Sequence, residues 1–398
     1  MSPGLIVLLL SLLLGLQPLT TDMYLPALPA LTLGFGASMS QAQLTLTALL
    51  LAFGCSQLFW GPMSDRFGRR PILLWGLAIY VVSAFACGFA PTMLSLIVWR
   101  SVQGAAMGAA VMCARAIVRD LYQPLEGARV MSTGLTGLGV IACLSAPVGG
   151  ALAQALDWRA VLLTLALCSS ATLAIIAWRF EETVPRRNPK ALQLHTLART
   201  WWHILRHPTF VAFSMLSICS YAGLFTFLAS SSFVFIQVLG LSKTEFGMVL
   251  FSSTLFYVAG TLLCRRLLLR FGVLRTVAIA GALSLTAGTL MGAMALAGWR
   301  SVWTVLPPFW LFMVGHGVHQ PCGQSGAVGP FAQAAGAASA LNGFLMMLTA
   351  FGVGSWLGLT MDGSVLPLTG GIWFWSACIA ATAWILVQRH ERGLALPA

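Results

Sequence analysis

The chain has 398 residues, of which 58% are hydrophobic and only 8% are charged, whereas roughly 25% of residues are charged in an ordinary soluble domain. This composition excludes a water-soluble globule, and the absence of low-complexity or charged runs excludes disordered and collagen-like chains. Because a bilayer core of about 30 Å needs about 20 apolar residues per helix, a chain of this length holds about twelve spans.

Apolar segments separated by charges, Gly and Pro predict an all-α membrane protein with twelve transmembrane helices. The longest hydrophilic interval, 181–208, follows the sixth span and predicts a cytoplasmic linker between two six-helix bundles, 1–180 and 209–398. Apolar and basic residues alternate in this linker at roughly helical spacing, which predicts an amphipathic helix on the inner membrane surface. The expected spans lie near 4–28, 41–61, 71–90, 92–113, 128–151, 159–179, 209–235, 246–264, 274–297, 302–323, 333–359 and 368–388.

The net charge of +12 indicates membrane orientation rather than a nucleic-acid partner. With the amino terminus inside, 18 of the 22 Lys and Arg residues fall in cytoplasmic segments, and only Arg159, Lys243 and Arg300 fall outside. This is the positive-inside bias, so we expect both termini in the cytoplasm and no nucleic-acid binding. The apolar start is interpreted as the first span rather than a secretory signal, because no Lys or Arg precedes it and no small-residue cleavage site follows it.

Two ionisable side chains are predicted deep in the spans, Asp22 in the first and Arg100 in the fourth. A charge at the bilayer centre costs about 2.5 to 3.5 kcal/mol on insertion scales, so each residue is a functional candidate. A rise of about 1.5 Å per residue places both in the outer half of the membrane, at a common level. One interpretation is a structural ion pair, or charges in a solvated vestibule. The other is that Asp22 binds and releases a proton, while the fixed charge of Arg100 tunes its proton affinity. A protonated Asp22 no longer attracts a cation, so protons and a cationic substrate would compete for it.

The face of the first span that lines a cavity is left open by the sequence. Tyr24 shares a stripe with Gln17 and Thr21, whereas Asp22 lies about 140° from Gln17 around an ideal helix. Pro18 is expected to distort this helix.

The loop between the second and third spans has the sequence GPMSDRFGRRP over 61–71. Its glycines permit close approach and a sharp turn, and its charges can pair with neighbours or cap a helix end. Arg119 and Asp120, which end the fourth span, are the expected partners. We interpret this loop as a latch that holds one conformation, with positive-inside retention as the alternative. The latch residues are Gly61, Asp65, Arg66, Gly68, Arg69, Arg119 and Asp120.

The fifth span contains GLGVIACLSAPVGG over 137–150, which combines small residues with Pro147 and the pair Gly149 and Gly150. Small residues let helices approach closely, and Pro bends a helix. Close packing explains this segment, and a hinge or a seal against leakage is the alternative.

The sequence RFG occurs at 66–68 and again at 270–272 in equivalent loops, which favours parallel repeats with a substrate site between the halves.

In the tenth span, His316 and His319 lie one turn apart, but no carboxylate accompanies them and Pro321 interrupts the helix. Hydrogen bonds between helices are the first interpretation, and a proton relay or a substrate contact is the alternative.

The nine cysteines are scattered through the spans without a CxxC motif, so we expect neither a disulfide framework nor a metal site. The candidate substrate-contacting residues are Asp22, Tyr24, Gln103, Tyr221, Phe225, His316 and Asn342. Gln103 and Asn342 are interpreted first as polar contacts between helices, and Tyr221 with Phe225 as packing.

Four segments carry a family resemblance: TDMYLPALPAL at 21–31, GPMSDRFGRR at 61–70, RSVQGAAMGAA at 100–110 and SAPVGG at 145–150. Together they resemble the major facilitator superfamily, and within it the bicyclomycin/chloramphenicol-resistance (Bcr/CflA) group of drug:proton antiporters. The resemblance implies that Asp22 acts in substrate or proton coupling, Arg100 in proton coupling, and the 61–71 loop as a latch. The second half departs from the loop motif, with Leu269 at the position equivalent to Asp65, so a symmetric latch is not expected.

The resemblance implies the major facilitator fold and export of small amphipathic drugs, antibiotics included, by alternating access across the inner membrane of a bacterial cell. We expect a monomer embedded in the lipid bilayer, with protons and a small-molecule substrate as partners and no cofactor beyond the proton gradient. The alternative is a proton-coupled transporter of one metabolite, such as an amino acid or sugar derivative. A membrane enzyme would need a nucleophile, a metal cluster or paired carboxylates, which these spans do not supply, and a non-transporting sensor on the same scaffold is the last alternative.

Overall fold

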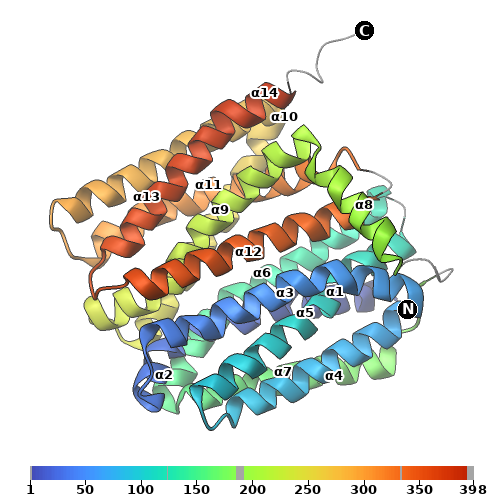
Figure 1. The fold of residues 1–398 in the computed structure, drawn as a ribbon, viewed down its shortest axis with the longest axis horizontal. Helices are drawn as coiled ribbons and strands as arrows, with labels where there is room; N and C mark the ends of the chain where they lie inside the picture. Colours follow the sequence, from blue (N-terminus) through green and yellow to red (C-terminus); the bar gives the residue numbers. More distant parts are fainter. Residues whose placement is uncertain (1, 123, 185–191, 332–333, 392–398) are drawn as a thin grey trace. The chain divides into compact units, whose positions relative to one another are not determined.

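The computed structural model describes residues 2–122, 124–184, 192–331 and 334–391, and every regular element within these ranges is a helix (Figure 1). The all-α prediction is confirmed. The chain divides into two compact units: Met1–Leu197 with Lys243–Gly247, and Ala198–Ser242 with Met248–Ala398. The sequence-based domains instead treated 181–208 as a separate linker and placed 243–247 in the second half.

The first unit, coloured from blue to green in Figure 1, contains six long helices and a short one. Their starts are set by polar caps, because Ser38, Thr92 and Asp157 each accept a hydrogen bond from a backbone N–H in the first turn that follows. A 3-10 turn, η1 (Leu25–Ala27), follows the first helix. The helices are α1 (Pro3–Asp22), α2 (Leu28–Phe35), α3 (Met39–Phe67), α4 (Arg69–Gly88), α5 (Met93–Leu121), α6 (Pro124–Ala155) and α7 (Trp158–Arg179).

The second unit begins within the amphipathic helix predicted in the linker, which is confirmed as α8 (Leu194–Leu205). Two π-helical turns, η2 (Phe233–Val238) and η4 (Thr382–Leu386), extend long helices of this unit. The remaining helices are α9 (Pro208–Ser232), α10 (Lys243–Leu296), which belongs to this unit from Met248 onward, α11 (Val302–Val328), α12 (Ala335–Thr360), α13 (Leu366–Ala381) and α14 (Val387–Glu391).

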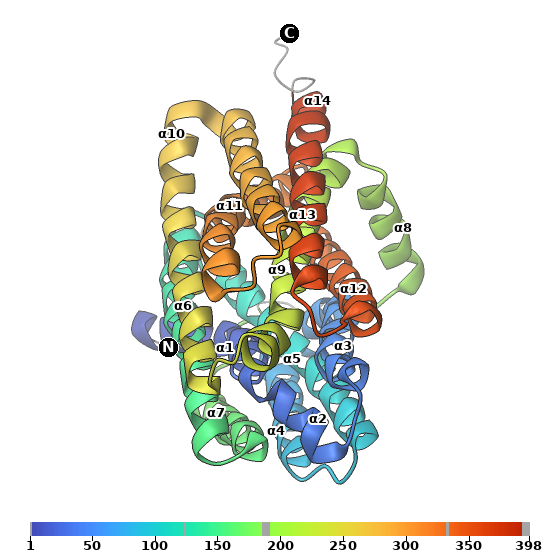
Figure 2. The same ribbon diagram turned by 90° about the vertical axis from the view of Figure 1, so that its left-hand side faces the viewer.

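Within the described residues, ten helices are long and apolar enough to cross a membrane, against twelve spans predicted. Much of the difference lies in α10, which has 54 residues and covers two predicted spans, 246–264 and 274–297. At about 1.5 Å per residue it would measure about 80 Å if straight, but Gly272 adopts φ 70°, a left-handed conformation that favours Gly. Figure 2 shows the two arms of α10 running in opposite directions. The other predicted span outside the ten is α11, which contains Pro307, Pro308 and Pro321.

Small residues set the closest helix contacts of the first unit. A Cβ at Gly104 on α5 would collide with the carbonyl of Leu49 on α3, and a Cβ at Gly149 on α6 would collide with the backbone of Met23. A Cβ at Gly150 would collide with the backbone of Lys243, the first residue of α10. Lys243 itself belongs to the first unit. Backbones this close need glycine, so close packing operates along 137–150, and a hinge there stays a prediction.

The contrast between two glycines on α6 can be tested. We expect Gly149→Ala to destabilise the protein by about 1 to 3 kcal/mol, because the added methyl has no space. Gly139→Ala is the matched control, since nothing lies within 4 Å of a Cβ there and Ala favours a helix. Thermal unfolding of both purified variants in detergent measures the difference, and equal melting temperatures would contradict the packing account.

Candidate functional site

The guanidinium of Arg100 on α5 is fully buried, with 0% of the residue exposed. Its Cζ atom lies 4.2 Å from the centroid of the Tyr24 ring. One Nη atom donates to Gln103 Oε1 at 2.8 Å, and the other donates to the carbonyl of Thr20 at 3.2 Å. An aromatic face and two acceptors therefore replace the water that this permanent charge loses on burial. The third nitrogen, Nε, has no hydrogen-bond partner among the described residues.

Further hydrogen bonds hold the groups around Arg100. The hydroxyl of Tyr24 lies 2.7 Å from Thr45 Oγ1 on α3, and Thr20 Oγ1 is hydrogen-bonded to the hydroxyl of Tyr80 on α4. Four helices of the first unit, α1, α3, α4 and α5, thus contribute to one polar cluster around the charge. Sequence reasoning missed the contributions of Thr20, Thr45 and Tyr80, for which polarity within an apolar span is the only sequence signal.

Two predicted substrate-contacting residues, Tyr24 and Gln103, belong to this cluster. Both are completely buried, and both contact the guanidinium of Arg100. In this structure they enclose a charge rather than face open space. The hydrogen bond of Gln103 joins two residues of α5, so the contact between helices that was its first interpretation stays a prediction.

Asp22 ends α1, is half-buried, and accepts a hydrogen bond from the Thr21 hydroxyl at 2.8 Å. The structure shows no ion pair between Asp22 and Arg100, and the ion pairs found among the described residues lie at the loop between α3 and α4. Successive helical residues are about 100° apart, so Asp22 lies about 200° around α1 from Thr20, whose hydroxyl and carbonyl serve the Arg100 cluster. The two charges that the sequence placed at one level are therefore on different sides of α1.

The side of α1 that carries Asp22 is the side that packs against α6. Ser11, which lies about three turns before Asp22, donates to the carbonyl of Gly134 at 3.3 Å. Gly15 fits against Ile141, and the backbone of Met23 meets Gly149. The half-buried carboxylate thus lies on the face of α1 next to the segment of α6 that contains Pro147.

The loop between α3 and α4 contains a cluster of charges. The side chain of Arg69, 3% exposed, reaches Asp65 at 2.7 Å and Asp120 at 2.8 Å, and it donates to Ser64 Oγ. Arg119 reaches Asp65 at 3.5 Å. Four of the predicted latch residues are therefore in direct contact, and they join the ends of α3, α4 and α5.

The other predicted latch residues differ in their surroundings. Gly68 adopts φ 108° and forms the sharp turn that was expected. The close approach expected at Gly61 is wrong, because a Cβ there would lie 3.5 Å from the Met112 methyl, an ordinary contact. Arg66 is exposed and lies over the ring of Phe67, with 5.4 Å from Cζ to the ring centroid.

Glu182, which the sequence analysis did not assign to the loop, caps the start of α4. The residue before α4 is Gly68, which has no side chain to cap it, and the Glu182 carboxylate instead accepts from the backbone N–H groups of Arg69 at 2.8 Å and Arg70 at 3.3 Å. Partial burial acts to raise the pKa of Glu182, but these bonds and those from Val184 and Thr183 outweigh it and lower the pKa. No local motif reveals a cap that comes from 113 residues away.

The second unit has its own buried polar cluster, which joins α9, α11 and α12. His316 Nδ1 lies 2.8 Å from Ser220 Oγ, and Ser217 Oγ donates to Asn342 Oδ1 at 3.1 Å. Gln320 Nε2 donates to the carbonyl of Ser217 at 3.0 Å. His316 and Asn342 thus make the hydrogen bonds between helices that were their first interpretation. Gln320 was not anticipated.

Three other predicted residues lie near this cluster on the same helices. Tyr221 and Phe225 on α9 stack with ring centroids 6.5 Å apart, and Phe225 is buried whereas Tyr221 is partly exposed. His319 on α11 is completely buried. Within the described residues, no group of three or more His, Cys, Asp or Glu side chains has a metal-binding arrangement.

Residues 10–355 match the family model described as Major Facilitator Superfamily. The chain is 31% identical to Multidrug resistance protein D of Escherichia coli (strain K12), with 92% of this chain and 90% of the relative covered. It is 28% identical to a chloramphenicol resistance protein of Pseudomonas aeruginosa, with 84% and 79% covered. Its fold matches the xylose transporter XylE of E. coli with a TM-score of 0.76 at 14% identity, over 97% of each chain.

The cap on α4 can be tested by Glu182→Ala. We expect faster hydrogen exchange at the amides of Arg69 and Arg70 and a loss of about 1 kcal/mol in stability, the usual cost of removing a helix cap. The matched control is Glu181→Ala, which removes the neighbouring exposed acid.

The pH dependence of this cap follows from the lowered pKa of Glu182. A carboxylate with a depressed pKa contributes its full stabilisation above its ordinary value of 4.5 and loses it as the pH falls through the lower folded value. Below pH 4.5 the exchange of the wild-type amides should therefore approach that of the variant, after correction for intrinsic rates. Exchange that is equal in both proteins at pH 7 would contradict the capping role.

Proposed function

The chain belongs to the Major Facilitator Superfamily, and from this premise we propose that it exports small amphipathic drugs, antibiotics included, in exchange for protons. The similarity to Multidrug resistance protein D over 92% of the chain carries this proposal. Similarity to a chloramphenicol resistance protein over 84% of the chain supports the same substrate class. Transport would proceed by alternating access, with the substrate site open to one side of the membrane at a time.

The location of the protein is proposed together with its function. The superfamily fold and the long apolar helices make it a multi-pass membrane protein. The distribution of Lys and Arg supports an orientation with both termini in the cytoplasm. We place the exporter in the bacterial inner membrane, where the proton gradient supplies the energy, and we expect a monomer without a cofactor.

Asp22 is the proposed site of exchange between proton and substrate. It is the acid within the first span, it is half-buried, and among the described residues its side chain accepts a hydrogen bond from the neutral hydroxyl of Thr21. Without a guanidinium bound to it, the carboxylate is available to take a proton or to attract a cationic group. Binding of the proton removes the attraction, so protons entering along the gradient would release a cationic substrate.

Arg100 is the proposed fixed charge of the coupling mechanism. Because an arginine side chain keeps its positive charge, this charge stays the same whether or not Asp22 holds a proton. The shell formed by Thr20, Tyr24 and Gln103 holds it in place. The unsatisfied Nε is a strong donor that a substrate or a rearranged side chain would satisfy in another state of the cycle.

Contacts among charged side chains support the proposed latch. Asp65, Arg69, Arg119 and Asp120 would hold the α3–α4 loop in one geometry, as a latch. We also propose roles for residues whose contacts do not yet indicate one. They are Gly61, Arg66 and Gly68 for the latch, Pro147, Gly149 and Gly150 for the hinge, and Tyr221, Phe225, His316 and Asn342 for substrate contact.

Proton exchange at Asp22 is tested in everted membrane vesicles across which a pH gradient is established. Quenching of a fluorescent dye measures this gradient. Adding a transported drug should release protons with the wild type but not with Asp22→Asn, which cannot ionise. Asp22→Glu keeps a titratable group and should retain part of the response. Drug-triggered proton release that is undiminished in Asp22→Asn would remove this residue from the mechanism.

The breadth of substrates is tested in a bacterial strain that lacks its own drug exporters. Expression of the protein should raise resistance to several chemically unrelated compounds, with chloramphenicol among those examined. The same strain without the protein is the control. Protection against a single chemotype would contradict multidrug export and favour a transporter of one metabolite.

A further inference from the structure

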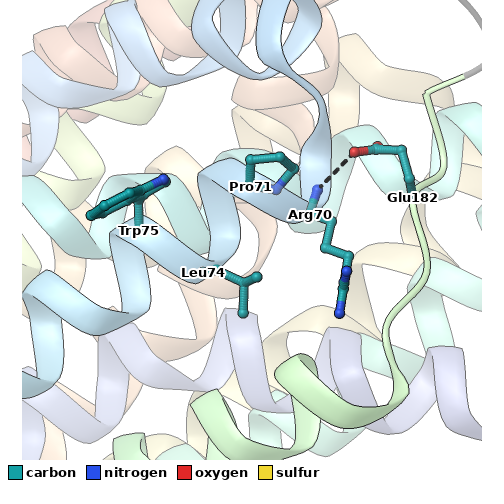
Figure 3. A pocket seen from close by; sticks show the side chains of 5 residues that line it. All are labelled: Arg70, Pro71, Leu74, Trp75 and Glu182. Carbon is teal, nitrogen blue, oxygen red and sulfur yellow. Dashed lines mark hydrogen bonds between the residues drawn. The ribbon is translucent and has the colours of Figure 1, made fainter.

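Two thiols of the second unit lie close together, those of Cys264 on α10 and Cys322 on α11. Their Sγ atoms are 3.7 Å apart, which is a hydrogen-bonding distance for sulfur. Both residues are buried, with 3% and 4% of their surface exposed, and both are thiols rather than halves of a disulfide. The pair is distinct from the pocket of about 580 Å³ at the start of α4, which belongs to the first unit (Figure 3). That pocket is lined by Arg70, Pro71, Leu74, Trp75 and Glu182.

Glycines bring the backbones of α10 and α11 together next to the two thiols. A Cβ at Gly260 would collide with the backbone of α11, and a Cβ at Gly317 would collide with the backbone of α10. Cys264 follows Gly260 by four residues and Cys322 follows Gly317 by five, so each thiol lies little more than one turn beyond the crossing. Main-chain packing therefore holds the two sulfurs near each other.

The thiols lie near a polar end of both helices. Arg265 and Arg266 directly follow Cys264 and are exposed, and Gln324, two residues after Cys322, is exposed as well. Basic residues that flank a span lie at the boundary between hydrocarbon and water. A small polar oxidant reaches this level from the water, and local opening of a helix end admits it to buried sulfur atoms.

We propose that Cys264 and Cys322 form a dithiol that a hydroperoxide converts into a disulfide. One sulfur attacks a peroxide oxygen, the O–O bond breaks, and a sulfenic acid forms while water leaves. The other sulfur attacks the sulfenic sulfur, the S–O bond breaks, and the hydroxyl leaves as water with the thiol proton. With hydrogen peroxide, the two thiols lose two electrons and two protons, and the peroxide is reduced to two water molecules.

The short distance between the sulfurs sets this pair apart from cysteines that only fill space. A buried thiol packs well as a small apolar group and needs no second thiol beside it for that. At 3.7 Å the sulfurs are almost in contact, so bond formation needs rotations of the two side chains rather than movement of either helix. The new bond would link α10 to α11, the helix that carries His316 and Gln320 of the buried polar cluster.

The test uses the intact protein in lipid nanodiscs, purified with a reductant that is removed before hydrogen peroxide is added in increasing doses. The remaining thiols are alkylated with N-ethylmaleimide after denaturation, and the peptides are identified by mass spectrometry. We expect a cross-linked peptide that joins Cys264 to Cys322 and separates on reduction, with loss of alkylation at both residues. It should appear no later than the dose that oxidises Cys168, which is exposed. Absence of this cross-link at that dose would overturn the proposal, and this outcome does not depend on any variant.

Substitution of single cysteines tests whether the two thiols are partners. In Cys264→Ser, the thiol of Cys322 should remain open to alkylation after the same dose of peroxide. Cys219→Ser removes another buried thiol of the second unit and should leave the cross-link between Cys264 and Cys322 unchanged. A cross-link from Cys322 to a different cysteine, or loss of the Cys264–Cys322 cross-link in Cys219→Ser, would count against the pair.

The role of the helix crossing is tested by Gly317→Ala, whose added methyl pushes α11 away from α10. The yield of the cross-link should fall in this variant. Gly352→Ala on α12 is the matched control, since nothing lies within 4 Å of a Cβ there, and its yield should equal that of the wild type. Equal yields in the two variants would overturn the packing basis of the proposal. The assay uses neither a drug nor a proton gradient, so its failure is distinct from failure of the export proposal.

Discussion

The burial of one guanidinium charge constrains the first unit more than any other interaction. Arg100 has no exposed surface and no carboxylate partner among the described residues, so neutral groups must replace its lost hydration. The Tyr24 ring, the Gln103 amide and the Thr20 carbonyl do so. Because these groups and their own partners come from α1, α3, α4 and α5, stabilising a single charge also orients four helices.

The same arrangement separates the fixed charge from the titratable one. Thr20 serves Arg100, and Asp22, two residues later, lies about 200° around the helix on the side of α6. A direct ion pair would hold Asp22 ionised and occupied, whereas a half-buried acid with a neutral partner can exchange a proton for another cation. Separation by helix geometry therefore suits the proposed coupling better than contact would.

The α3–α4 loop shows how far a local motif can be interpreted. The contacts among Asp65, Arg69, Arg119 and Asp120 agree with the pairing expected from their sequence positions, since charges at adjoining helix ends are the available partners. The cap from Glu182 could not be found in this way, because α4 receives it from a residue 113 positions away. Gly61 shows the opposite error, since its conformational freedom suggested a close approach that its surroundings do not require.

The sequence by itself determined the helical class, the positions of the spans and the residues that carry charge into the membrane, because hydropathy and periodicity are local properties of the chain. It also determined the break within α10, where a left-handed Gly272 separates two predicted spans. Only the tertiary structure decided which partners surround Arg100, which side of α1 carries Asp22 and which residue caps α4. These depend on contacts between helices distant in sequence, and no periodicity within one helix specifies what a neighbouring helix will present to it.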